Sequence, residues 1–187
     1  DTRRHSGCQG AGRIQHQMTL AFRGSMTRQP RRLLLAVGIL GIGLVAGGLV
    51  LARTMNLAAC PLCILQRMVY LLISIEVFLS LAIFQTYRSS FYTSVGVSLT
   101  AAAGIWMAGY QTWLQRFAVN VSCTADQPWW ESFVYWAGER VPLLFEATGL
   151  CSEAGWKFMS LSIAEWSLLM FAAMAVGAIR AAALSRR

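Results

Sequence analysis

The stretch CPLCILQRMVYLLISIEVFLSLAIF, residues 60–84, decides the fold. It begins with two cysteines, Cys60 and Cys63, and continues as one apolar segment. A segment of about 20 apolar residues is long enough to cross a bilayer as a helix. Further apolar segments of this kind predict an all-α membrane protein, a four-helix bundle with spans at about 33–51, 64–84, 91–112 and 163–179.

The composition agrees with a membrane protein. Hydrophobic residues make up 56% of the chain and charged residues only 13%, whereas soluble domains carry about 25% charged residues. The net charge of +8 comes mostly from arginines within residues 1–32. Because no basic stripe runs through the rest of the chain, nucleic-acid binding is not favoured and the lipid bilayer is the expected surrounding.

We expect a cytoplasmic N-terminal arm over residues 1–32, a four-helix membrane domain over 33–183 and a cytoplasmic tail over 184–187. Residues 1–25 are polar and resemble an upstream extension or an over-extended start, so they are set apart from the fold together with Cys8. In the first span, Gly43 and Gly47 stand at GxxxG spacing. This spacing predicts close packing of that span against another helix of the chain.

The arginines predict the orientation of the spans. They gather before the first span, between the second and third, and after the fourth, which is one side of the membrane if there are four spans. By the positive-inside rule that side is cytoplasmic, as are both termini. The loops 52–63 and 113–162 are then periplasmic, and all four cysteines outside the N-terminal arm face the oxidising side of a bacterial inner membrane.

The second periplasmic loop is rich in tryptophan, a residue favoured at the membrane interface. Trp156, Met159 and Ile163 recur at helical spacing after Cys151, with polar residues between them. This pattern predicts a short amphipathic interfacial helix that lies on the bilayer surface and keeps Cys151 near Cys60.

The first cysteine pair has the local features of a reactive dithiol. Proline is favoured at the first position of a helix, which would make Cys60 the N-cap and put Cys63 in the first turn. Free backbone N–H groups at a helix start favour a thiolate there. Arg67 follows Cys63 by one turn on the same helix face. Its guanidinium could stabilise that thiolate or a quinone carbonyl, or instead anchor the helix to lipid phosphates.

Two other roles for the cysteines are less favoured. A zinc site is not expected, because Cys123 and Cys151 are far apart in sequence and no histidine occurs in the spans or loops. A purely structural framework accounts for a Cys123–Cys151 bridge, but closing the small Cys60–Cys63 ring adds little stabilisation. The sequence alone leaves all three full pairings of four cysteines open.

The chain resembles the DsbB family of disulfide-forming membrane proteins over roughly residues 30–180. The resemblance rests on CPLCILQR (residues 60–67), QTWLQ (111–115), VPLLFEATGLC (141–151) and the aromatic residues Trp156, Phe158 and Trp166. It implies a thiol:quinone oxidoreductase that reoxidises DsbA, a soluble periplasmic dithiol oxidase of the thioredoxin fold, and reduces a membrane quinone, either ubiquinone or menaquinone.

The resemblance also implies the roles of individual residues. Cys123 would be attacked by reduced DsbA and form the mixed disulfide. Cys151 would then pair with Cys60, which leaves Cys63 as a thiolate against the quinone. Arg67 would favour that thiolate and the charge that develops on the quinone.

Two positions in the spans stay open at this point. Some family members carry a histidine near the outer end of the third span, close to the quinone, where this chain has Gln115 and Arg116. Either side chain could donate a hydrogen bond there, and Gln115 is the expected quinone contact. Glu76 lies in the middle of the second span and is expected to be a packing residue more than a proton carrier. The alternatives to the main interpretation are an enzyme like quinone or vitamin K epoxide reductase and a membrane scaffold with structural disulfides.

Overall fold

The computed structural model describes residues 6–83, 87–117, 129–147, 149 and 156–186. Four of its helices are long and apolar enough to cross a membrane, with spans Gln29–Thr54, Pro61–Ile83, Ser89–Phe117 and Ile163–Leu184, so the predicted all-α membrane fold is confirmed. In chain order the elements are α1 (Ser6–Thr54), α2 (Pro61–Ile83), α3 (Tyr87–Phe117), α4 (Trp129–Arg140), α5 (Pro142–Phe145), β1 (Lys157–Phe158), β2 (Leu161–Ser162) and α6 (Ile163–Leu184).

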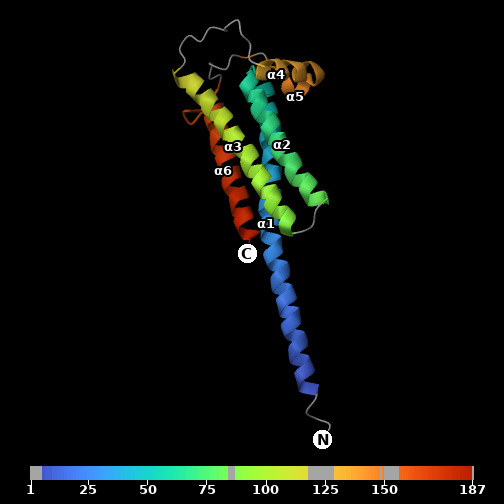
Figure 1. The fold of residues 1–187 in the computed structure, drawn as a ribbon. Helices are drawn as coiled ribbons and strands as arrows, with labels where there is room; N and C mark the ends of the chain where they lie inside the picture. Colours follow the sequence, from blue (N-terminus) through green and yellow to red (C-terminus); the bar gives the residue numbers. More distant parts are fainter. Residues whose placement is uncertain (1–5, 84–86, 118–128, 148, 150–155, 187) are drawn as a thin grey trace.

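Helix α1 is longer than its apolar segment. It begins at Ser6, so residues set apart in the sequence interpretation continue the same helix, and in Figure 1 this part projects away from the other helices. Pro30 lies inside α1 and has no N–H to donate. It stands one residue after the start of the membrane-spanning part at Gln29.

The four long helices lie side by side (Figure 1). Helix α2 contacts α1 and α3, and α6 contacts α1 and α3, with the α3–α6 contact the most extensive. The centre of the bundle is apolar and includes Leu34, Ile73, Val97, Phe171 and Met174, each at most 1% exposed. The spans are helical because a helix satisfies its own backbone polar groups within the membrane. The helices then associate through close van der Waals contact between their side chains.

Glycines allow close approach at two places in the bundle. A Cβ on Gly104 of α3 would lie 2.5 Å from ring atoms of Phe171 on α6, and a Cβ on Gly41 of α1 would lie 2.9 Å from the Tyr70 carbonyl oxygen of α2. The predicted GxxxG contact is wrong, because no described atom lies within 4 Å of a Cβ built on Gly43 or Gly47. The close contacts of α1 lie on a different face.

The predicted amphipathic helix after Cys151 is also wrong. Strands β1 and β2 pair antiparallel there, with Phe158 opposite Leu161. The two residues between them, Met159 and Ser160, have φ values of 53° and 69°, as a two-residue hairpin turn requires. A capping box between Ser162 and Glu165 then starts α6. The described helices of this loop are α4 and α5, which come earlier in the chain.

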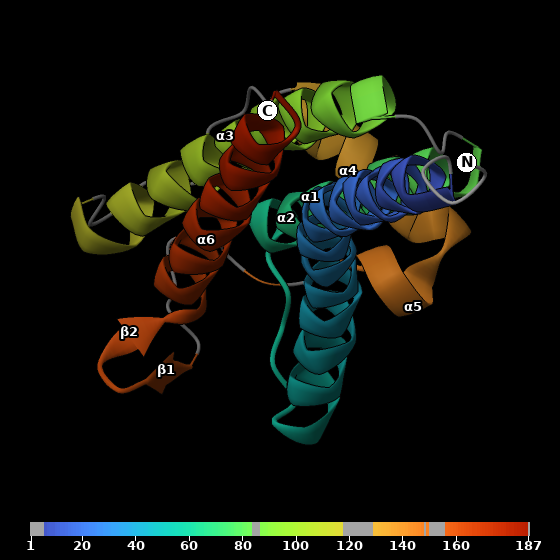
Figure 2. The ribbon, with the colours of Figure 1, turned by 90° about the horizontal axis from the view of Figure 1, so that it is seen from below.

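The hairpin is held against α6 by aromatic contacts. Trp166 donates from Nε1 to the Phe158 carbonyl oxygen at 3.1 Å, and the Trp156 and Phe158 rings stack at 5.7 Å. The hairpin, α4 and α5 lie at the end of the bundle where α2 begins, opposite to the C-terminus (Figure 1). In Figure 2 the hairpin lies beside α6, while α5 lies on the far side of α1. This end of the bundle carries the first cysteine pair.

Candidate functional site

The first cysteine pair occupies the start of α2 as the sequence predicts. Cys60 precedes the helix, and its carbonyl oxygen accepts the first helical hydrogen bond from Ile64 N at 3.1 Å. The Cys60 and Cys63 sulfur atoms lie 2.8 Å apart, and the Cys63 backbone N–H donates to Cys60 Sγ at 3.3 Å. Cys60 is 4% exposed, whereas Cys63 is half-buried. The two thiols are therefore positioned to form or break a disulfide with little movement.

Two buried glutamines complete the surroundings of the sulfur atoms. Gln111 of α3 donates from Nε2 to Cys60 Sγ at 3.2 Å and to Cys63 Sγ at 3.1 Å. Gln66 of α2 donates from Nε2 to Gln111 Oε1 at 2.8 Å. Sequence reasoning assigned neither residue a role. The available signal was polarity, since an amide deep in an apolar helix needs a partner from another helix.

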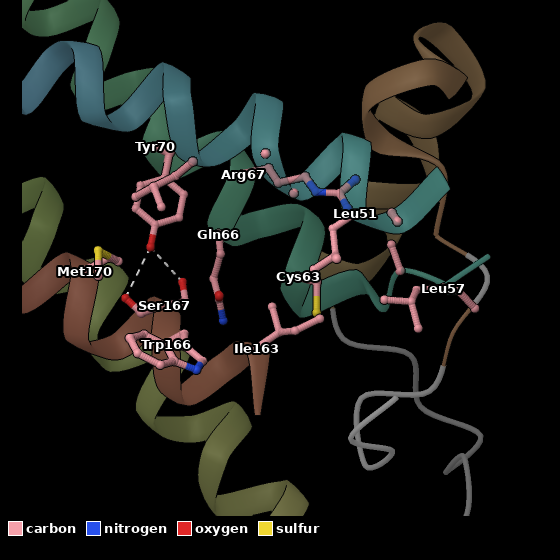
Figure 3. Close-up of a pocket in the computed structure, with 16 residues that line it drawn as sticks. Leu51, Leu57, Cys63, Gln66, Arg67, Tyr70, Ile163, Trp166, Ser167 and Met170 are labelled. Atoms are coloured by element: carbon pink, nitrogen blue, oxygen red, sulfur yellow. Dashed lines mark hydrogen bonds between the residues drawn. The ribbon is translucent and has the colours of Figure 1, made fainter. Parts of the chain in front are cut away.

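A cavity of about 240 Å³ adjoins this cysteine pair and lies between α1, α2 and α6. Figure 3 shows Cys63, Gln66 and Arg67 of α2 around this space, with Ile163 and Trp166 of α6 on another side. Most of the lining surface is apolar. Such a lining suits a flat, apolar ligand that is oriented by a few polar groups.

Arg67 lines the same cavity as Cys63. Its Nη1 donates to the Leu144 carbonyl oxygen of α5 at 3.2 Å. The structure therefore brings together Cys60, Cys63 and Arg67, three of the predicted site residues. It also gives the arginine a protein partner at the end of the span.

Tyr70 and Ser167 bound the cavity further into the bundle. The Tyr70 hydroxyl lies 2.8 Å from Ser167 Oγ and donates to the Ser167 carbonyl oxygen at 3.2 Å, and Figure 3 draws both contacts. The Tyr70 ring stacks on Phe171 at 4.1 Å. These contacts join α2 to α6 beneath the cavity.

The structure does not bring Gln115 to the cysteines. Gln115 lines a separate polar pocket of about 190 Å³ together with Arg116 and Glu165, which form an ion pair. The residue of α3 that reaches the sulfur atoms is Gln111, one turn nearer the bundle centre. One turn corresponds to about 6 Å along the helix, and a quinone contact by Gln115 stays a prediction.

The second cysteine pair, Cys123 and Cys151, lies outside the described residues. The described residue nearest to Cys151 in sequence is Gly149, two positions earlier. Its backbone N–H donates to the Ala59 carbonyl oxygen at 3.0 Å. A Cβ on Gly149 would lie 2.5 Å from the Ala58 carbonyl oxygen, so only glycine fits this close approach to the segment before Cys60.

Two further predictions concern charged and metal-binding groups. Glu76 accepts a hydrogen bond from Thr100 Oγ1 of α3 at 2.8 Å, and its second oxygen is buried with no partner among the described residues. Glu76 therefore joins α2 to α3 away from the cavity. Within the described ranges, no group of three or more His, Cys, Asp or Glu side chains could hold a metal ion.

Comparison with known proteins agrees with the geometry. A family model described as "Disulfide bond formation protein DsbB" matches residues 30–181. A protein named "Disulfide bond formation protein B" from Dechloromonas aromatica (strain RCB) is 36% identical over 145 residues, which is 76% of this chain and 86% of the relative. A relative of the same name from Polaromonas sp. (strain JS666 / ATCC BAA-500) is 31% identical over 160 residues, or 84% and 94% of the two chains.

The family match includes the second and third spans, nearly all of the first and fourth, and the first cysteine pair. A third relative, "Disulfide bond formation protein B" from Nitrosomonas europaea, is 35% identical over 153 residues, which is 78% of this chain and 89% of the relative. The dithiol at the start of α2 is the chemical group that the formation of disulfide bonds needs. The chain therefore belongs to the DsbB family, membrane oxidoreductases that form disulfide bonds.

Proposed function

We propose that this protein is a thiol:quinone oxidoreductase that reoxidises a DsbA-like periplasmic partner and passes the electrons to a membrane quinone. The observation that carries the proposal is the shared cavity of Cys63 and Arg67, a thiol and a cation that face one apolar space. A structural disulfide needs neither a cavity nor a cation. An electron relay to an apolar carrier uses the cavity to hold the carrier, and a cation there favours the negative charge that develops.

The residues around the cavity fit a quinone. Apolar side chains from α1 and α6 suit the ring and tail, and Arg67 and Gln66 of α2 supply polar groups for the ring oxygens. Cys63 supplies the sulfur that faces the ring. When bound, ubiquinone or menaquinone accepts two electrons and two protons and leaves as quinol.

The chain's own residues supply those electrons. The Cys60–Cys63 dithiol gives up two electrons and two protons as one sulfur–sulfur bond forms between the two residues. Thiolate character at Cys63 favours this step, because the thiolate is the reactive form of cysteine. Arg67 holds positive charge at the same cavity and favours that form.

The partner's electrons would enter through the second pair. A thiolate of the reduced partner attacks Cys123 of a Cys123–Cys151 disulfide, and the released Cys151 thiolate attacks the Cys60–Cys63 disulfide at Cys60 and releases Cys63. The partner's second thiol then breaks the bond to Cys123, so that the partner leaves oxidised. The freed Cys123 thiolate attacks Cys151, which restores the Cys123–Cys151 disulfide and leaves Cys60 and Cys63 as the dithiol. Support comes from Gly149, which bonds to Ala59. Gly149 lies two residues before Cys151 in the sequence, and we propose that this contact serves the exchange between Cys151 and Cys60.

We further propose that both termini are cytoplasmic and that the cysteine loops are periplasmic, in a bacterial inner membrane. The arginines at the chain ends and the position of the hairpin, α4 and α5 at the opposite end support this orientation (Figure 1). A phosphatase reporter, which is active only outside the cytoplasm, should be inactive when fused after Leu184 and active when inserted after Arg140. The reverse pattern would invert the topology.

The activity is tested by following quinone absorbance without oxygen, with purified protein, a reduced DsbA-like protein and a short-chain ubiquinone or menaquinone. We expect loss of the oxidised-quinone band, abolished by Cys63→Ser and by Cys123→Ser. If folded protein leaves both quinones oxidised, the proposal fails and the structural-disulfide alternative stands.

A further inference from the structure

The buried amides of Gln66 and Gln111 form a short series of hydrogen bonds that leads from the cavity to the sulfur atoms. Gln66 lines the cavity and donates to Gln111 Oε1 at 2.8 Å. Gln111 in turn donates to both sulfur atoms, at 3.2 and 3.1 Å. The two glutamine side chains are only 4% and 1% exposed, so water does not replace either contact.

The donor-to-acceptor direction of these hydrogen bonds has a chemical consequence. A glutamine amide carries a donor end and an acceptor end, and only the donor end stabilises a thiolate. If Gln111 were turned over, its NH₂ group would face the NH₂ group of Gln66 and its oxygen would face the sulfur atoms. The contact with Gln66 would then be unfavourable, and so would the contact with a Cys63 thiolate, while an unmet amide buried in a membrane protein is costly.

We propose that Gln66 is a positioning residue, which holds the Gln111 amide with its NH₂ group on the two sulfur atoms and so stabilises the reduced, thiolate form of the Cys60–Cys63 pair. The Cys63 sulfur accepts from two donors at once, the Cys60 thiol at 2.8 Å and Gln111. Gln66 touches neither sulfur and acts through Gln111. The use of that thiolate in quinone reduction rests on the proposed function; the effect on the thiols does not.

Two readouts test the proposal without a quinone or a partner protein. The measurements use the full chain with Cys8, Cys123 and Cys151 each replaced by Ser, so that Cys60 and Cys63 form the one remaining dithiol. The reduction potential of this dithiol is measured against a thiol buffer, and the rate at which iodoacetamide modifies Cys63 is measured at neutral pH by mass spectrometry. A merely structural role for Gln66 would move neither value in protein that stays folded.

Gln111→Met keeps the size of the side chain and removes the donor to both sulfur atoms. We expect alkylation of Cys63 to slow about tenfold, since hydrogen bonds to charged groups are among the strongest. A tenfold loss of the reduced form lowers the potential by about 30 mV for a two-electron couple. Thr112→Val is the matched control, because Thr112 neighbours Gln111 but bonds only to its own helix at Ala108 O.

Gln66→Met removes the group that orients Gln111. We expect alkylation of Cys63 to slow roughly threefold and the reduction potential to fall, because Gln111 keeps its donor but loses its fixed orientation. In the Gln111→Met background, Gln66→Met should add nothing, since it acts only through Gln111. Gln66→Asn, which keeps an amide but is too short to reach Gln111, should reproduce the effect if the Met variant does not fold.

Two results would overturn the proposal. One is an unchanged potential and alkylation rate in Gln66→Met or Gln66→Asn while Gln111→Met alters both. The other is an additive effect in the double variant. A failure of this kind would leave quinone reduction by the parent protein intact, whereas failure of the proposed function would leave the thiol measurements as expected.

Discussion

The role of Arg67 depends on the groups that surround its guanidinium. An arginine near the end of a membrane helix often reaches toward lipid phosphates. Here it donates to the Leu144 carbonyl oxygen and lines the cavity that Cys63 also lines. A cation held by the protein beside a thiol is suited to binding a ligand and stabilising negative charge.

We expect Arg67→Met to lower kcat/KM for a short-chain quinone roughly 10- to 100-fold, the range of one charge-assisted hydrogen bond. Arg67→Lys should recover part of this loss, because lysine keeps the charge but not the planar fork. Quinone reduction at varied quinone concentration measures both values. Arg116→Met is the control, since Arg116 is 60% exposed and pairs with Glu165 away from the cavity; an equal loss there would contradict a specific role for Arg67.

Glu76 is expected to serve packing. Its contact is with Thr100 of α3, and glutamine keeps an oxygen that can accept from the same hydroxyl. We therefore expect Glu76→Gln to leave quinone turnover close to the parent value and to unfold at the same or a higher temperature, because an amide costs less than a carboxylate in the membrane. A large loss of turnover in the anaerobic assay would show that Glu76 carries protons.

At the scale of elements, the bundle depends on where the helices come closest. Gly104 of α3 leaves room for the Phe171 ring of α6, in the most extensive interhelix contact of the fold. Phe171 also stacks on Tyr70, which bounds the cavity. The packing of α3 on α6 therefore supports the wall of the site.

Gly104→Ala should lower the free energy of unfolding by about 1–3 kcal/mol, the usual cost of an added carbon in a filled core. The cause is the 2.5 Å approach of its Cβ to the Phe171 ring. Thermal unfolding in detergent measures the change. Gly109→Ala on the same helix meets no described atom within 4 Å and should be neutral or slightly stabilising; equal destabilisation by both would point to helix α3 itself.

At the scale of the whole molecule, the order of electron transfer depends on which cysteine meets the partner. Ala58 and Ala59 hold Gly149 directly before Cys60. This contact ties the end of the second loop to the first cysteine pair across about 90 residues of sequence. Because Gly149 precedes Cys151 by two residues, we expect Cys151 to be the residue that exchanges with Cys60.

The variant Cys151→Ser tests this order. With its resolving cysteine removed, the mixed disulfide between Cys123 and the DsbA-like partner should accumulate, because the next exchange step is blocked. Non-reducing electrophoresis followed by peptide mapping identifies the linked cysteine. An adduct on Cys60 would reverse the roles of the two pairs, and Cys123→Ser should give no adduct.

Much of the site could be predicted because its features are local. The Cys60–Cys63 pair at a helix start and Arg67 one turn later follow from proline preference and helical spacing within eight residues. The hairpin at Met159–Ser160 was missed, because apolar spacing alone cannot show that the chain turns back with positive φ. Gln111 was missed for another reason, since its role depends on contacts with α2.

The sequence by itself determined the four spans, the arginine-rich ends and the reactive pair at the mouth of α2, since hydropathy and helical rise act over short stretches of chain. Only the tertiary structure decided that Gln111 and not Gln115 meets the sulfur atoms, and that Gln66 donates a hydrogen bond to Gln111. It also decided which glycines of α1 make contact. The register between two helices comes from side-chain packing between distant segments, and a shift of one turn leaves the hydropathy pattern of each helix unchanged.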